Sequence, residues 1–210
     1  MAKKDNIRNK EVIDETGYKL PTISGKEIRV EVRDVGQGNC NEIYIDGNLK
    51  YVYDFGTNIY ATKEEVDNLI NEVYSIYEEA KPILILSHWD LDHYHLLKGL
   101  EAKNKNPFSA FVFIGELPNK TSQDVYEFMN EKLVKEVYSI TPKRMKGVPN
   151  LTTLTSNAVL TIYSPDGRSS RNNSELVCVA HRRDTDIILS GDSYYEQIHN
   201  AILSNSVKNK

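Results

Sequence analysis

The sequence predicts an α/β or α+β protein with two layers of β-sheet. Short β-branched and aromatic runs separated by turn residues stand near both ends of the chain, and apolar runs alternate with amphipathic helices in its middle. The length of 210 residues suits one well-buried domain. Residues 1–25 mix charge, Asn and Gly without periodicity, so we expect a flexible lead-in there and the domain over 26–210.

The first part of the domain is expected to be an antiparallel β meander. Residues 28–35, 41–45 and 50–55 are strand-like runs, and the segments between them, Gly36-Gln37-Gly38 and Asp46-Gly47-Asn48, are rich in turn formers. Tight turns of this kind join neighbouring strands, so the chain should open with sheet.

The middle section is expected to alternate helix and strand. A capping box at Thr62-Lys63-Glu64-Glu65 and apolar residues at three- and four-residue spacing predict a helix over 63–79. The continuous apolar run at 82–86 predicts a strand buried on both faces. The further expected elements are a helix over 92–100, a strand over 108–114 and a helix over 122–138 with Val137 facing inward.

The last part of the chain is expected to return to sheet. Strands are predicted at 151–155, 158–163, 175–181 and 186–190, with the last two joined as a hairpin across 182–185. A closing helix is expected over 194–203.

Composition argues against several classes of protein. A net charge of -4 disfavours a surface that clamps nucleic acid over its whole extent. The first 20 residues are polar, and no apolar run approaches the length of a membrane span, so neither a signal peptide nor a membrane helix is expected. Cys40 and Cys178 are too few for a disulfide framework. These features favour a cytoplasmic protein.

The chemistry is expected in a short polar segment directly after the apolar run at 82–86. His88, Asp90, Asp92 and His93 fall within six residues there, where α/β proteins place ligand sites. Each residue alone has a simpler interpretation, because Asp92 could cap a helix and the histidines could face solvent. Four ligand-type residues at this spacing instead favour a metal site, and imidazole with carboxylate suits Zn, Fe or Mn.

The segment His88-Trp89-Asp90-Leu91-Asp92-His93 resembles the His-x-His-x-Asp-His signature of the metallo-β-lactamase superfamily, with Asp90 in place of the middle His. Further segments match in order, and their pattern looks most like the hydrolase domains of competence-type DNA-uptake proteins. These segments are Asp34-Val35-Gly36-Gln37-Gly38-Asn39, Tyr53-Asp54-Phe55-Gly56, Tyr163-Ser164-Pro165, Asn172-Asn173-Ser174 and Leu189-Ser190-Gly191-Asp192.

The resemblance implies a metallo-β-lactamase-like αββα sandwich with one or two divalent metal ions. His88 and Asp90 would contribute to a first metal, Asp92 and His93 to a second, and Asp192 would bridge both. A metal-activated water would be the nucleophile, and Asp92 could orient it or accept its proton. Asp54 would support the metal loop without binding metal.

Departures from the family pattern leave the metal open. Asp90 is a harder ligand than His and shifts preference from Zn toward Mn or Fe. Many members have a His where this chain has Asn173 and Ser174, which are assigned a supporting role. The family's last His has no counterpart, so we expect its C-terminal strand and helix to be missing. His199 is expected to be structural or exposed, as are His95 and His181.

Two functions remain open from the sequence. The first is a metal-dependent hydrolase, with a phosphodiester as the favoured substrate class. The second is a degenerate or truncated member of the fold that acts as a scaffold or binding module without catalysis. In either case a partner chain or self-association could complete the fold.

Overall fold

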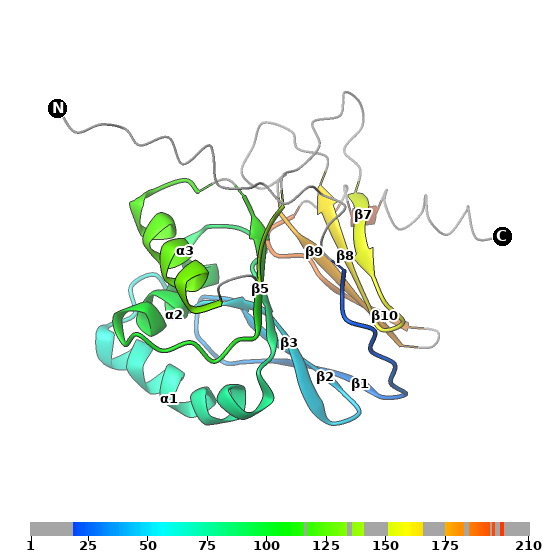
Figure 1. Ribbon diagram of the computed structural model, residues 1–210, viewed down its shortest axis with the longest axis horizontal. Helices are drawn as coiled ribbons and strands as arrows, with labels where there is room; N and C mark the ends of the chain where they lie inside the picture. The colour runs from blue at the N-terminus through cyan, green and yellow to red at the C-terminus, as the bar shows by residue number, and fades with distance from the viewer. Residues whose placement is uncertain are drawn as a thin grey trace.

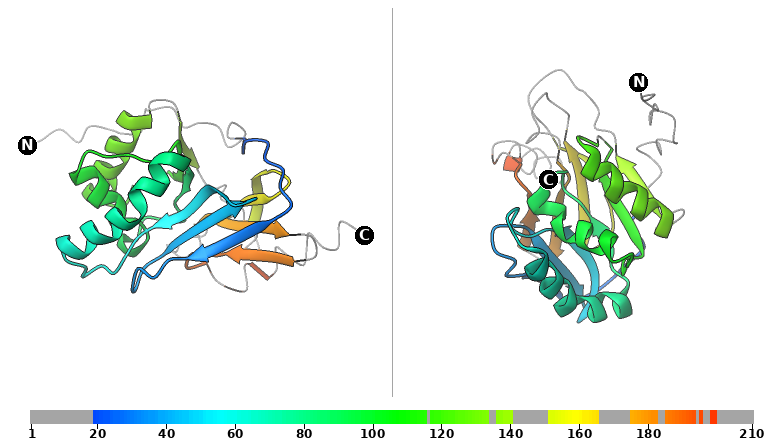
Figure 2. Two further views of the ribbon diagram at one scale, coloured as in Figure 1. Left: turned by 90° about the horizontal axis from the view of Figure 1, so that it is seen from below. Right: turned by 90° about the vertical axis from the view of Figure 1, so that its left-hand side faces the viewer.

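Two β-sheets face each other in the described part of the chain, and helices α1, α2 and α3 cover the outer face of the larger sheet (Figure 1; Figure 2). The computed structural model describes residues 19–115, 117–133, 136–140, 151–165, 175–182 and 185–193, together with 195, 198 and 199. The predicted α/β class with two layers of sheet is confirmed.

The larger sheet has six strands in the order β1-β2-β3-β4-β5-β6. Strands β1 to β3 form the expected antiparallel meander, and β3 to β6 run parallel to one another. The bounds are β1 (Ile28–Val32), β2 (Cys40–Ile45), β3 (Asn48–Phe55), β4 (Ile83–Ile85), β5 (Ala110–Ile114) and β6 (Val137–Ile140). Carboxyl ends of parallel strands meet at one edge, so the segments after β3 and β4 lie together.

The helices are α1 (Lys63–Ala80), α2 (Leu91–Ala102) and α3 (Lys120–Leu133). The capping box at the start of α1 is confirmed, because the Thr62 hydroxyl accepts the backbone N–H of Glu65 and the Glu65 carboxylate accepts that of Thr62. The buried side chains of α1, Val66, Ile70, Val73 and Tyr77, follow the predicted spacing. They pack with residues of α2 and the sheet in one hydrophobic cluster.

The predicted helix over 122–138 is wrong at both ends. The side-chain oxygen of Asn119 accepts the backbone N–H of Ser122 at 3.0 Å, which starts α3 at Lys120. At the other end α3 stops at Leu133, and Val137 opens strand β6 instead of lying on the helix. Residues 137–140 pair with the open edge of β5, and this tertiary pairing outweighs the local helical spacing.

The smaller sheet is an antiparallel meander in the order β10-β9-β8-β7. Its strands are β7 (Leu151–Ser156), β8 (Leu160–Pro165), β9 (Val177–Arg182) and β10 (Thr185–Leu189). Tyr51 and Tyr53 of β3 pack between the sheets against Ile162 and Cys178. This hydrophobic cluster holds the inner faces of the two sheets together. The closing helix expected over 194–203 falls almost wholly outside the described residues.

The described chain makes tertiary contacts ahead of residue 26, where the domain is expected to begin. Leu20 is buried in the core between the sheets, and its backbone N–H donates to Thr155 Oγ1 at 3.1 Å. Within the described part of the chain, no helix has the length and apolar character needed to cross a membrane. Cys40 and Cys178 are buried free thiols.

Candidate metal centre

The candidate site lies where the two sheets meet, beyond the carboxyl ends of β3 and β4. The first sheet contributes the segment from Ser87 into α2, and the second contributes the start of β9 and the turn after β10. The backbone N–H of Leu176 donates to the Ser87 carbonyl at 3.0 Å, and the Tyr53 hydroxyl donates to the Leu176 carbonyl at 2.7 Å. These bonds join the sheets beside the site.

Asp54 enters the site through an irregularity in β3. Its partners on β2 are out of step, since Asn41 pairs with Tyr53 and Cys40 pairs with Phe55, so Asp54 is the extra residue of a bulge. Its φ of 62° is left-handed, a conformation that Asp adopts more readily than most residues. The bulge turns Phe55 toward the helices, although Tyr53 faces the second sheet. The Asp54 side chain is fully buried.

The Asp54 carboxylate organises the loop that carries both histidines. Its Oδ1 accepts the backbone N–H of Ser87 at 2.7 Å, and its Oδ2 accepts the Ser87 hydroxyl at 2.9 Å. His93 Nδ1 lies 2.9 Å from the same Oδ2, and His88 Nδ1 lies 3.0 Å from Ser87 Oγ. A carboxylate only accepts, and the Ser87 proton is committed to Asp54. Both histidines therefore carry a proton on Nδ1.

The Nε2 atoms of His88 and His93 both face Asp192. His88 Nε2 lies 3.9 Å from Asp192 Oδ2, and His93 Nε2 lies 3.6 Å from Asp192 Oδ1. One ligand atom from each of the three residues falls within 4.8 Å of the others, and the centroids of the two imidazole rings are 4.0 Å apart. Asp192 is half-exposed whereas both histidines are buried, so the three groups form a cluster that opens to solvent on one side.

The two aspartates of the sequence motif lie at the rim of this cluster. Asp90 Oδ2 is 3.7 Å from His88 Nε2, and Asp92 Oδ2 is 4.0 Å from His93 Nε2. Asp90, not Asp92, occupies the N-cap position of α2, and its side chain makes no capping hydrogen bond. Its carboxylate is therefore left to face His88.

The first turn of α2 is held tightly against the end of β3. Gly56 packs on the backbone of Asp92 so closely that a Cβ atom would overlap the Asp92 carbonyl. The backbone N–H of Asn39 donates to that carbonyl at 3.1 Å, and the N–H of Gly56 donates to the Asn39 carbonyl at 2.8 Å. These contacts fix where the helix begins and thereby where His93 lies.

The histidines respond in opposite directions to their surroundings. Burial lowers the pKa of His93, but the hydrogen bond to Asp54 and the charges of the site aspartates outweigh it, so the pKa rises to about 9. Burial and the neighbouring His93 lower the pKa of His88. The negative charge of the site thus favours the protonated form of His93, whereas His88 stays neutral more easily.

The donor set fits a divalent transition metal. Two imidazoles whose Nδ1 protons are engaged elsewhere present Nε2 toward a carboxylate, which is how histidine ligands are commonly oriented by outer hydrogen bonds. A divalent cation held by the two Nε2 atoms and the carboxylates would take the place of the extra proton on His93 and would offset the negative charge of the aspartates. Imidazole and carboxylate together suit Zn, Mn or Fe.

Comparison with known proteins finds a likeness in structure and none in sequence. No protein-family profile matches the chain, and no curated protein is similar to it in sequence. The crystal structure of human tRNase Z, short form, a metallo-β-lactamase superfamily member, aligns with a TM-score of 0.45 and 11% identity. The alignment covers 81% of this chain and 65% of that chain. What the site of this protein can do follows from its own contacts.

Glu175 lies in the site although its sequence position suggested no role. Its side chain is fully buried, its Oε2 accepts the backbone N–H of Asp192 at 2.6 Å, and the same oxygen is 3.8 Å from His88 Nδ1. Burial raises the pKa of Glu175 to about 8. A charged residue directly before an apolar strand was the available signal. The neighbouring residues expected to support the site, Asn173 and Ser174, lie outside the described residues.

The other histidines lie apart from the cluster. His95 is buried on α2 with its Nδ1 3.0 Å from the Asn58 carbonyl, so it packs as expected. His181 is partly exposed on β9 and its Nδ1 lies 2.8 Å from Asp186 Oδ1. The ring of His199 stacks on that of Tyr195 at 5.8 Å, and it is not part of the three-residue group.

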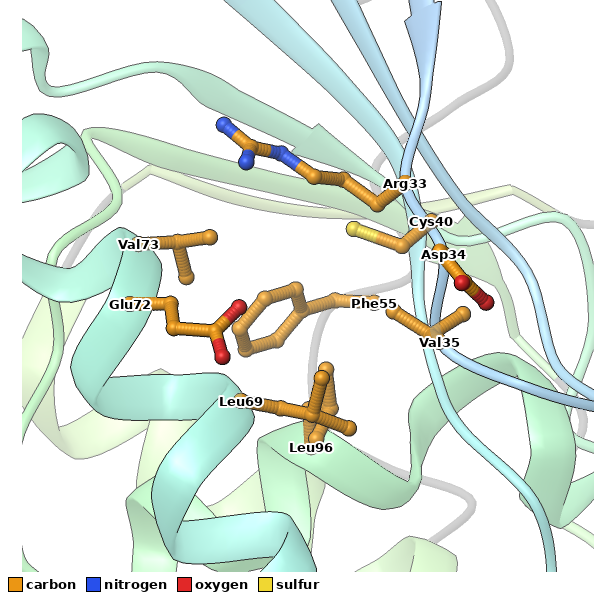
Figure 3. A pocket seen from close by; sticks show the side chains of 9 residues that line it. All are labelled: Arg33, Asp34, Val35, Cys40, Phe55, Leu69, Glu72, Val73 and Leu96. Atoms are coloured by element: carbon orange, nitrogen blue, oxygen red, sulfur yellow. The ribbon is translucent and has the colours of Figure 1, made fainter.

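A separate pocket lies on the helix side of the larger sheet (Figure 3). Phe55 and Cys40 line it together with side chains of α1 and α2, and none of the clustered histidines or aspartates does. Arg33 at its edge is already paired, since its guanidinium donates twice to buried Glu42 at 2.8 and 3.0 Å. The guanidinium of Arg33 is thus already engaged, and the clustered histidines and aspartates lie at the sheet ends instead.

Proposed function

We propose that this chain is a metal-dependent hydrolase that cleaves a phosphodiester or another ester-like bond. The observation that carries the proposal is the convergence of His88 Nε2, His93 Nε2 and the Asp192 carboxylate at the mouth between the sheets. Buried imidazoles with an exposed carboxylate at an open edge are typical of metal centres that admit a substrate.

Each side chain of the site has a distinct role in this proposal. His88, His93 and Asp192 bind the metal, with Asp90 and Asp92 as further ligands from the rim. The cation would supply Lewis acidity and would lower the pKa of a water molecule toward neutral pH. Asp92, which is partly exposed, accepts a proton from water at the mouth of the site. Asp54 and Ser87 hold the Nδ1 protons of the histidines and so keep Nε2 available.

The carboxylates bear on how many ions the site would hold and on which element it would favour. The two oxygens of Asp192 face different histidines, and each histidine has one further aspartate beside it, so the set can hold one or two ions. Three carboxylates with two imidazoles make a harder donor set than a histidine-rich one, which favours Mn or Fe over Zn.

The order of the sequence motifs supports a relationship with the hydrolase domains of competence-type DNA-uptake proteins. Along the chain, the segment with Asp54 and Gly56 comes first, the segment from His88 to His93 second and Asp192 last, as in that group. A phosphodiester is the substrate class that this relationship favours. We also propose that self-association or a partner chain completes the fold.

Elemental analysis and hydrolysis assays test the proposal. The chain is purified, stripped with chelator, reloaded with Zn²⁺ or Mn²⁺ and assayed with bis(p-nitrophenyl) phosphate. We expect at least one metal equivalent and a rate that chelator abolishes. His88→Ala and His93→Ala should lose both, and His181→Ala, which alters a histidine away from the cluster, should keep both.

The alternative is a fold that binds without catalysis. The hydrolase proposal would be overturned if the wild-type chain takes up no transition metal and its hydrolysis is unchanged in His88→Ala. The non-catalytic scaffold would then be the remaining function. Size-exclusion chromatography with and without metal would show whether two copies of the chain associate.

A further inference from the structure

Glu175 is a buried carboxyl group placed directly behind the candidate metal ligands. It precedes β9, its side chain is fully buried, and Oε1 has no hydrogen-bond partner among the described residues. Burying such a group is unfavourable unless a specific interaction compensates. The compensating interaction is the bond that Oε2 accepts from the backbone N–H of Asp192 at 2.6 Å.

The turn that carries Asp192 is packed on Glu175 as well as bonded to it. Gly191 has a left-handed φ of 55°, and a Cβ atom on it would lie 2.8 Å from Glu175 Oε2 and 3.1 Å from the Ser87 side chain. The turn therefore rests on Glu175 from the second sheet and on Ser87 from the first. Any shift of Glu175 moves the backbone from which the Asp192 carboxylate projects.

A ligand on a turn needs such support more than the histidines do. His93 lies on a helix and is held by Asp54, and His88 is held by Ser87. Asp192 comes after the end of β10, and its side chain is half-exposed. The hydrogen bond to Glu175 is the contact that ties its backbone to the buried part of the site.

We propose that Glu175 is a positioning residue that holds the Gly191–Asp192 turn so that the Asp192 carboxylate faces both histidines. This inference rests on the proposed metal site. The Glu175 side chain acts as a hydrogen-bond acceptor behind the ligand and does not itself bind the ion. It is the counterpart, in the second sheet, of Asp54 in the first.

Two substitutions separate the acceptor from the bulk of the side chain. Glu175→Gln keeps a carbonyl oxygen for the Asp192 N–H, whereas Glu175→Met fills the same space without an acceptor. Affinity for Zn²⁺ and Mn²⁺ is measured by calorimetry on the metal-free chain. We expect Glu175→Met to lose about 10- to 100-fold, as for other residues that orient ligands. Glu175→Gln should retain most of the affinity.

Hydrogen exchange of the Asp192 amide gives a readout without metal or activity. It should be protected in the wild type and in Glu175→Gln, and it should exchange fast in Glu175→Met. Glu42→Gln, at another fully buried carboxyl group away from the cluster, is the matched control and should leave the affinity unchanged. If Glu175→Met does not fold, Gly191→Ala replaces it, because the added methyl displaces the turn from an intact Glu175.

The outcomes separate the two proposals. Wild-type affinity together with a protected Asp192 amide in Glu175→Met would overturn the positioning role. So would an equal loss of affinity in Glu175→Gln and Glu175→Met, since the acceptor would then be irrelevant. A wild type that binds no metal overturns the proposed function instead, and in that case the exchange of the Asp192 amide still decides whether Glu175 holds the turn.

Discussion

His93 Nδ1 lies 2.9 Å from Asp54 Oδ2, and both side chains are buried. The two residues come from different elements, the first turn of α2 and a bulge in β3. Because the carboxylate holds the Nδ1 proton, the opposite nitrogen of the ring is directed toward Asp192. The pair therefore connects the backbone irregularity of a strand to the orientation of a candidate ligand.

Replacing this carboxylate tests its role directly. Asn is nearly the same size as Asp and tolerates the left-handed φ of residue 54, so Asp54→Asn changes the chemistry and spares the backbone. The new amide group would confront donors from Ser87 and His93. We expect metal affinity to fall about 10- to 100-fold, measured by calorimetry. Unchanged affinity in a folded Asp54→Asn variant would contradict this role.

A methyl group at Gly56 is expected to disturb the start of α2. Gly56→Ala would place its Cβ against the Asp92 carbonyl, and backbone cannot move aside as a side chain can. We expect a loss of about 1–3 kcal/mol or more in the free energy of unfolding, measured with urea.

Gly47→Ala provides the comparison for Gly56→Ala. Gly47 has a positive φ of 77° and nothing within 4 Å of an added Cβ, so it reports conformational strain alone. That strain costs about 1–2 kcal/mol. Metal affinity should fall in Gly56→Ala and stay unchanged in Gly47→Ala. Equal effects of the two substitutions on metal affinity would argue against close packing of Gly56 on α2.

Alkaline unfolding should reveal the buried phenols between the sheets. Tyr51 is fully buried, and burial raises its pKa to about 12 from an ordinary value of 10.0. Below pH 10 the phenol is neutral in both states, whereas between pH 10 and 12 the unfolded chain ionises first. Stability is therefore present below pH 10 and is lost as pH rises through the folded pKa, by about 2–3 kcal/mol for this group.

Tyr51→Phe should reduce that loss, with the unfolding free energy measured by denaturant at pH 9 to 11.5. The same dependence on pH in the wild type and in Tyr51→Phe would count against the prediction. Tyr53 should add to the slope, because burial raises its pKa well above 10.0.

Neither cysteine should react in the folded protein. Burial raises the pKa of the Cys40 thiol to about 12 and that of Cys178 well above 9.0, and both side chains are inaccessible. Since the thiolate is the reactive form, Ellman's reagent at pH 8 should label the folded chain very slowly. Denaturant should release two equivalents, one for each cysteine of the sequence. Rapid labelling of the folded chain would show that the structure around at least one of the two cysteines opens.

Much of the architecture was predictable because local patterns and packing agree. The runs that became β2 and β3, the capping box of α1 and the buried spacing along it are consistent with their final surroundings. At Val137 the two disagree. The local spacing predicts a helix, but the segment pairs with the edge of β5 and forms a strand. The identity of an edge's partner depends on residues distant in sequence.

The candidate ligands were also visible in the sequence, and their arrangement was not. His88, Asp90, Asp92 and His93 cluster within one segment, so a shared metal-binding role is predicted from spacing alone. That Asp192 turns toward the two Nε2 atoms, while Asp90 and Asp92 remain at the rim, depends on how the second sheet docks. The role of Asn173 and Ser174 stays a prediction.

The sequence by itself determined the class of fold and the residue types of the site, because periodicity and ligand spacing are local properties. Only the tertiary structure decided that each neutral histidine keeps its proton on Nδ1 and that the buried Glu175 stands behind Asp192. Asp54 and Glu175 act through contacts to residues far away in the chain, Asp54 with His93 and Glu175 with Asp192. Such contacts exist only once each sheet has formed together with the segments that flank it, and no local pattern encodes them.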